Sequence, residues 1–201
     1  MFSFDPITLP EGFREGITLL AYLLALMWVL AVVDLMTGRR VLNKLSIQPR
    51  RLAGLPGIAV APLLHGGFGH LAANSGPLVI LGTVILLQGL EVLGLVTVFC
   101  WLVSGVGIWL LGRPGTRHLG ASGVVFGYLG YILLRGYFER SPGAIAAAVV
   151  VGLLYGSALW GLLPLQQGKS WVGHGMGFAA GVIVARKLPI MLEWVRNNSG
   201  W

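Results

Sequence analysis

Charged side chains are scarce in this chain of 201 residues, where Asp, Glu, Lys and Arg together make up only 10%. Soluble proteins carry about 25% charged residues. Hydrophobic residues make up 56% of the sequence, and its mean hydropathy is +0.82. This composition excludes an ordinary soluble domain and indicates a polytopic membrane protein built as one domain.

Acidic residues are few, and cysteine occurs once. Seven Asp and Glu stand against 14 Lys and Arg, a net charge of +7. The basic residues are spread over the connections beside apolar runs, which favours contact with anionic lipid headgroups and argues against nucleic acid as a partner. The single cysteine, Cys100, excludes an internal disulfide. The first residues, Met1 to Glu15, are polar and mixed, so no removable signal peptide is expected.

Long apolar runs dominate what is present, and each is close to the ~20 residues that span a bilayer as a helix. We expect an all-α membrane protein with six transmembrane helices at about 17–36, 70–90, 92–111, 122–138, 142–163 and 174–188. A polar tail (1–16) precedes this membrane domain (17–190), and a short polar tail (191–201) follows it. The long basic connection after the first run contains three prolines and is expected to have structure of its own.

Four polar residues stand out within the runs: His70, Asn74, Ser122 and His174. All lie near the N-terminal ends of the second, fourth and sixth runs. Because successive spans alternate in direction, these three run parallel and their N-terminal ends share one side of the membrane. Polar residues inside spans are costly and tend to mark function.

Glycines predict which runs touch. Gly173, Gly177 and Gly181 form a stripe at four-residue spacing on the sixth run, and Gly123 and Gly127 lie on one face of the fourth. Small residues let membrane helices pack closely. Such packing would bring the serine of the fourth run to the histidine of the sixth.

A hydroxyl beside an imidazole is the minimal activated nucleophile, so Ser122 and His174 are the candidate catalytic pair. Asp34, Glu91 and Glu139 are expected at span ends opposite this pair, which predicts a dyad without a carboxylate. The residues Gln166, Gln167 and Ser170 lie in a loop expected to cap the site.

His70 and Asn74 are four residues apart, on one helical face, and both can donate hydrogen bonds. With the Ser122 backbone N–H they could form an oxyanion hole. A metal site from His65, His70 and His174 lacks a carboxylate or cysteine partner, so neither a metal nor another cofactor is expected. Serine at a helix start is usually a cap, and His65 and His118 are interpreted as loop histidines. The convergence of four polar residues at one depth favours a catalytic site.

Three motifs, which follow one another along the chain as they do in the family, resemble the rhomboid family of intramembrane serine proteases over about Pro62 to Ala185. They are Gly120-Ala121-Ser122-Gly123, the stretch His65-Gly-Gly-Phe-Gly-His70-Leu-Ala-Ala-Asn74, and Gly173-His174-Gly175-Met176-Gly177 with Gly181 following. The resemblance implies that Ser122 is the nucleophile and His174 the base. It also implies that His70 and Asn74 stabilise the oxyanion with the Ser122 backbone, and Gly120, which opens the first motif, is grouped with these binding residues.

One departure is Phe126, which stands where some relatives have a tyrosine packed against the catalytic histidine. Its ring is still expected to stack on His174.

The resemblance implies a serine endopeptidase that cleaves transmembrane segments of other membrane proteins. It also implies a multi-pass protein of the bacterial inner membrane, with both termini in the cytoplasm and the site facing outward. The basic residues give no clean orientation by the positive-inside rule, because the site side carries slightly more of them.

Two alternatives stay open. One is a catalytically silent relative that binds membrane helices, although such relatives usually lose the serine or histidine. The other is a small transporter, which should spread polar residues through the membrane depth or show repeat symmetry. The sequence leaves the natural substrate, the oligomeric state and the lipid preference open.

Overall fold

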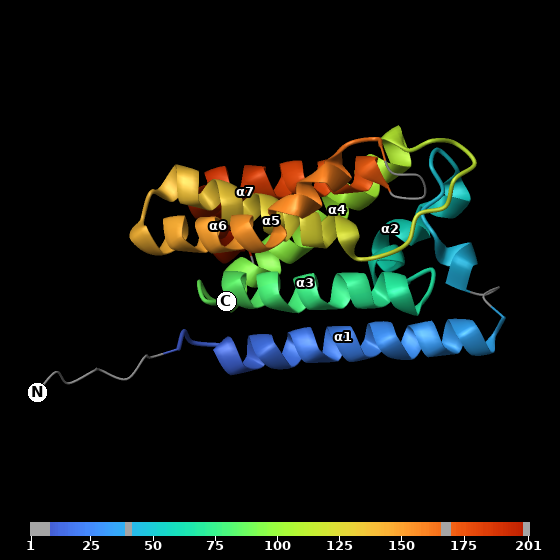
Figure 1. Ribbon diagram of the computed structural model, residues 1–201, viewed down its shortest axis with the longest axis horizontal. Helices are drawn as coiled ribbons and strands as arrows, with labels where there is room; N and C mark the ends of the chain where they lie inside the picture. The colour runs from blue at the N-terminus through green and yellow to red at the C-terminus, as the bar shows by residue number, and fades with distance from the viewer. Residues whose placement is uncertain (1–8, 39–41, 166–169, 199–201) are drawn as a thin grey trace, which may run out of the picture.

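The computed structural model describes residues 9–38, 42–165 and 170–198, and over these ranges the chain is helical, with one isolated β-bridge. Figure 1 shows the long helices lying side by side. The α-helices are α1 (Phe13–Met36), α2 (Pro56–Val60), α3 (Phe68–Leu86), α4 (Leu90–Leu111), α5 (Ser122–Glu139), α6 (Pro142–Tyr155) and α7 (Trp171–Asn198). Short 3₁₀ helices are η1 (Leu42–Leu45), η2 (Leu52–Gly54), η3 (Ala61–Leu63) and η4 (Gly156–Leu162), the last of which continues α6.

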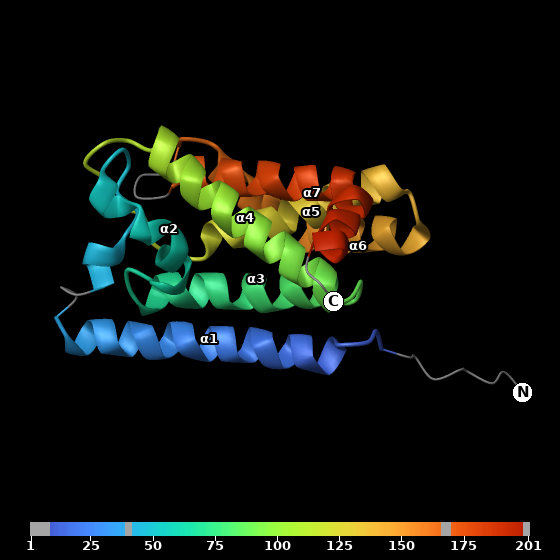
Figure 2. The same cartoon turned by 180° about the vertical axis from the view of Figure 1, so that it is seen from behind.

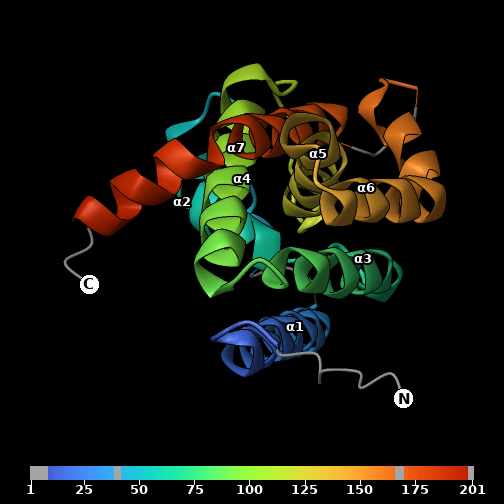
Figure 3. The same ribbon diagram turned by 90° about the vertical axis from the view of Figure 1, so that its left-hand side faces the viewer.

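Five of the described helices are long and apolar enough to cross a membrane: α1, α3, α4, α6 with η4, and α7. The sixth expected span, α5, is not among them. It has 18 residues, interrupted by glycines, tyrosines and Arg135, and ten of the 18 are buried. It packs against α3, α4, α6 and α7, which surround it in Figure 3. A helix surrounded by other helices does not need an apolar face toward lipid, so its composition falls short of a spanning helix.

The connection between α1 and α3 has its own structure, as predicted. It contains η1, η2, α2 and η3, and two tryptophans of α4 fasten it. The Trp101 indole donates to the Ile58 carbonyl at 2.9 Å, and the Trp109 indole donates to the Arg51 carbonyl at 3.0 Å. α4 itself crosses the bundle obliquely, as Figure 2 shows. The connection is therefore held at the end of the bundle where α3 and α5 begin (Figure 1).

α5 and α7 pack so closely that their backbones touch. A Cβ atom at Gly177 would overlap the carbonyl oxygen of Gly123, and one at Gly181 would overlap that of Gly127. On another side of α5, a Cβ at Gly127 would overlap the buried Cys100 side chain of α4. The predicted packing of the fourth run on the sixth is confirmed, and it fixes the positions of the residues at the starts of both helices.

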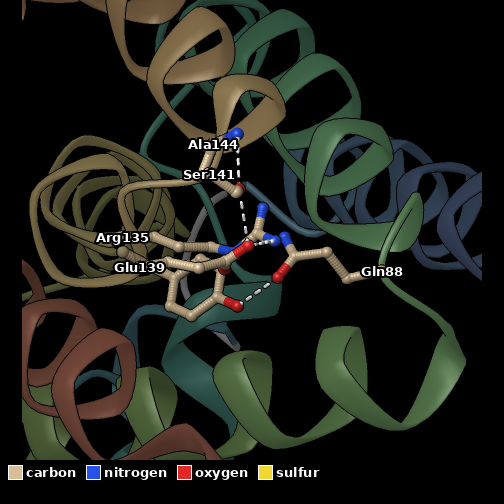
Figure 4. Close-up of polar contacts among 6 residues, drawn as sticks. Gln88, Arg135, Glu139, Ser141 and Ala144 are labelled. Atoms are coloured by element: carbon tan, nitrogen blue, oxygen red, sulfur yellow. Dashed lines mark hydrogen bonds and ion pairs between the residues drawn. The ribbon is translucent and has the colours of Figure 1, made fainter.

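A polar network ties the other ends of α3, α5 and α6 together (Figure 4). The Tyr131 hydroxyl donates to Gln88 at 2.5 Å. Glu139 accepts hydrogen bonds from Arg135 at 2.9 Å and from Ser141 at 2.7 Å, and the Ser141 hydroxyl caps the first turn of α6. These bonds hold α6 at its N-terminal end, and its other end reaches the candidate site through η4.

Candidate functional site

The helices α3, α5 and α7 begin at one end of the bundle, called the site end below (Figure 1). His70 and Asn74 lie in the first two turns of α3, Ser122 is the first residue of α5, and His174 lies in the first turn of α7. All four line one cavity of about 1080 Å³. The structure therefore brings together the four polar residues that the sequence singled out.

Ser122 and His174 are in direct contact. The Ser122 Oγ lies 3.0 Å from the His174 Nε2, a hydrogen-bond distance between residues 52 positions apart. The contact depends on the packing of α5 on α7, because each residue stands close to the glycine stripe of its own helix. The His174 side chain is only 6% exposed, so its imidazole is screened from bulk water.

The second nitrogen of His174, Nδ1, lies 2.9 Å from the carbonyl oxygen of Gly161 in η4. A carbonyl only accepts, so Nδ1 donates and the neutral imidazole keeps its lone pair on Nε2, toward Ser122. Gly161 fits there because a Cβ would lie 2.8 Å from the Phe126 ring and 3.3 Å from Nδ1. A backbone carbonyl thus orients the histidine, a role that the sequence did not reveal because every residue has a carbonyl.

Phe126 stacks on His174, as predicted. The two ring centroids are 4.1 Å apart and the planes differ by 6°. The phenyl ring covers one face of the imidazole and restricts its rotation. With the Gly161 carbonyl at its edge, the His174 ring is fixed in both plane and tautomer.

The prediction that Asp34 lies opposite the site was wrong. α1 runs antiparallel to α3, so its C-terminal end, which carries Asp34, lies at the site end (Figure 1). Asp34 is 6% exposed rather than in water. It is not among the residues that line the cavity.

His70 and Asn74 form the α3 wall of the cavity, and Gly120 packs against His70 without being among the residues that line the cavity. Asn74 is 5% exposed, and its amide donates to the His70 carbonyl at 2.9 Å. Gly120 has a φ of +110°, which disfavours any side chain, and a Cβ there would lie 2.6 Å from His70 Cε1. The backbone that leads into Ser122 therefore passes directly over the His70 ring.

His65 lies in the loop before α3, as interpreted, but it is buried and supports this wall. Its Nε2 accepts a hydrogen bond from the Ala121 N–H at 3.3 Å, and its ring meets the His70 ring edge-on at 5.1 Å. Burial, and secondarily the nearby His70, lowers the pKa of His65 to about 4, so it is neutral at pH 7. Burial also lowers the pKa of His118, which lines the cavity.

The cavity wall changes character along its length. Deeper along the helices it is lined by apolar side chains, which include Pro77, Leu81, Val125, Leu129 and Ala158. At the site end the connection between α4 and α5 contributes Arg113, Thr116, Arg117 and His118. Ser170, expected in a capping loop, also lines the cavity, whereas Gln166 and Gln167 lie outside the described residues.

This arrangement suits nucleophilic chemistry on a carbonyl group. A hydroxyl lies beside the lone pair of a fixed neutral imidazole, and donors from α3 share its cavity. Within the described ranges, no group of three or more His, Cys, Asp or Glu side chains is placed to hold a metal ion.

The sequence is similar to a known protein family and to several individual proteins. The family model described as the rhomboid domain matches residues 54–189. An uncharacterized protein of Mycobacterium tuberculosis is 39% identical over 184 residues, which cover 88% of this chain and 76% of the relative. A protein of Mycobacterium bovis matches to the same extent, and one of Mycobacterium leprae is 36% identical over 178 residues, covering 85% and 70% of the two chains.

Proposed function

Because this chain belongs to the rhomboid family, we propose that it is an intramembrane serine endopeptidase that cleaves transmembrane segments of other membrane proteins. The observation that carries the proposal is the 3.0 Å contact between the Ser122 Oγ and the His174 Nε2. The contact lies in a cavity with apolar walls at one end and polar ones at the other. Such a cavity suits a substrate that leaves the lipid and meets water at the scissile bond.

In the proposed reaction the Ser122 Oγ attacks the peptide carbonyl carbon while His174 Nε2 takes the hydroxyl proton. The imidazolium that forms is oriented by its Nδ1–H bond to the Gly161 carbonyl. The tetrahedral oxyanion accepts hydrogen bonds from the Ser122 N–H and from the His70 and Asn74 side chains. Asn74 donates to the His70 carbonyl in the free protein, and its second amide hydrogen remains for the oxyanion.

Collapse of the intermediate breaks the C–N bond, and His174 returns its proton to the leaving amine. Water, activated by the same Nε2, then attacks the Ser122 ester and regenerates the hydroxyl. The substrate segment has to unwind first, because a helix keeps its peptide bonds hydrogen-bonded and out of reach.

We further propose that α5 crosses the membrane as a sixth span, surrounded by four of the five apolar ones, namely α3, α4, α6 and α7. The proposed location is the bacterial cell membrane, with both termini in the cytoplasm and the site facing outward. Accessibility of single cysteines to a membrane-impermeant thiol reagent in cells tests the orientation. A cysteine at position 115 should react, and one at position 193 should not.

The proposed activity is tested by labelling the purified, detergent-solubilised protein with a fluorophosphonate probe. Wild-type protein should be labelled, and Ser122→Ala and His174→Ala should not. Ser157→Ala is the matched control, since Ser157 lines the same cavity and should not be the reactive serine. If folded wild-type protein is not labelled, the chain is better described as a catalytically silent relative that binds membrane helices.

A further inference from the structure

Acidic residues are concentrated at one end of the bundle, whereas basic residues occur at both ends. Most described acidic residues lie at the end away from the site: Glu11 and Glu15 before and in the first turn of α1, Glu91 in the first turn of α4, Glu139 at the end of α5 and Glu193 near the end of α7. At the site end Asp34 is the one acidic residue in the described part of the chain, and it is buried. The described basic residues there are Lys44, Arg50, Arg51, Arg113 and Arg117. The surface of the site end is therefore strongly positive.

Two of these basic residues, Arg113 and Arg117, line the same cavity as Ser122 and His174. Both are exposed, and they come from the connection between α4 and α5. No Asp or Glu is found among the described residues that line the cavity. Arg50 does not line the cavity, and its guanidinium donates to the Gly112 carbonyl at 3.0 Å. We call Arg113 and Arg117 the basic rim.

We propose that the basic rim selects substrates with acidic residues in the juxtamembrane stretch beside the cleaved bond. This inference rests on the proposed function and names its substrate class. A substrate segment that reaches Ser122 has its apolar part along Leu81 and Leu129 and its water-side flank at the rim. Guanidinium groups bind carboxylates through paired hydrogen bonds.

The charge distribution supports a functional reading of the rim. Membrane proteins concentrate Lys and Arg in cytoplasmic loops. At the proposed outward end of this chain, five described basic residues stand against one buried acidic residue, so the positive charge there needs another reason. A cavity lined by one sign of charge attracts oppositely charged ligands and raises their rate of association. Anionic lipid headgroups can also bind arginine. Arg113 and Arg117, however, line the cavity that holds Ser122 and His174, which favours a substrate as their ligand.

Binding of two matched peptides to full-length Ser122→Ala protein in a non-ionic detergent tests the proposal. Both peptides carry the same apolar segment, flanked by three Asp in one and three Asn in the other. The acidic peptide should bind about 2-fold to 30-fold more tightly at low salt, the range for two exposed ion pairs. The preference should nearly vanish at about 1 M salt, where the Debye length is ~3 Å.

The double substitution Arg113→Gln and Arg117→Gln should abolish most of the preference. Arg14→Gln is the matched control at the other end of the bundle, and it should preserve the preference. Equal binding of both peptides, or a full preference in the double variant, overturns the proposal. Loss of the preference when phosphatidylglycerol is added also overturns it and assigns the rim to lipid headgroups. The peptide binding is measured on Ser122→Ala protein, which has no nucleophile. A missing preference for the acidic peptide can therefore be told apart from a failure of wild-type protein to react with the fluorophosphonate.

Discussion

Replacing Gly177 by alanine should separate Ser122 from His174 without altering either residue. The added methyl group would overlap the Gly123 carbonyl oxygen and lie 2.8 Å from its carbonyl carbon. Gly123 directly follows Ser122 in the chain. α5 and α7 must therefore move apart until the methyl group fits.

The magnitude follows from the size of this overlap. Real Cβ atoms essentially never lie within 3.0 Å of such neighbours, so the helices should separate by about 1 Å, a misplacement that can cost about 100-fold in rate. The Ser122–His174 distance of 3.0 Å would then exceed a hydrogen bond. Overpacking of this kind also destabilises a protein by about 1–3 kcal/mol.

The assay is the rate of fluorophosphonate labelling together with the melting temperature in detergent. Gly177→Ala should be labelled about 100-fold more slowly and should melt at a lower temperature. Gly175→Ala is the matched control, because it adjoins His174 on the same helix and its Cβ would have nothing within 4 Å. If Gly177→Ala were labelled as fast as wild type and melted at the same temperature, the claim that backbone contact between α5 and α7 aligns the dyad would be refuted.

Three further predictions address the oxyanion wall, the pH dependence and the far end of the bundle. Asn74→Ala should slow fluorophosphonate labelling about 100-fold with little change in melting temperature, since one oxyanion donor is lost; an unchanged rate would remove Asn74 from that role. The pKa of His65 is about 4 in the folded protein and 6.5 in the unfolded chain, so the folded protein holds this imidazole neutral. As the pH falls, the unfolded chain therefore takes up the proton first. The free energy of unfolding should therefore fall between pH 6.5 and about 4, by at most about 3 kcal/mol relative to His65→Gln, and parallel pH profiles would contradict this. Tyr131→Phe should cost about 1 kcal/mol of stability and leave labelling unchanged, because its bond to Gln88 lies at the end away from the site; slower labelling would show that the two ends are coupled.

Much of the site could be anticipated because helix length and direction are local properties. The runs that carry Ser122 and His174 are separated by one intervening span, so their N-terminal ends share one side in any up-and-down bundle. The four-residue glycine spacing then predicts which faces meet. Phe126 could be expected to stack on His174 because the family resemblance puts it where some relatives have a tyrosine packed against the histidine.

Other expectations were wrong or incomplete. Asp34 was predicted at the wrong end, although the alternation of spans puts the C-terminal end of the first run on the site side. The tail expected from 191 onward is helical to Asn198, where Arg196 donates to Glu91 at 2.8 Å. α5 has too many glycines, tyrosines and charges for a lipid-facing helix, and only its neighbours explain that composition.

The sequence by itself determined the class of the protein, the helical runs, the shared side of His70, Asn74, Ser122 and His174, and the family motifs. These follow from hydropathy and periodicity, which are properties of contiguous residues. Only the tertiary structure decided that the Gly161 carbonyl orients His174, that His65 holds the Ala121 N–H, and that Arg113 and Arg117 line the cavity of the dyad. A carbonyl, an amide or a loop arginine looks the same at every position in a sequence, and its role is set by what the fold places beside it.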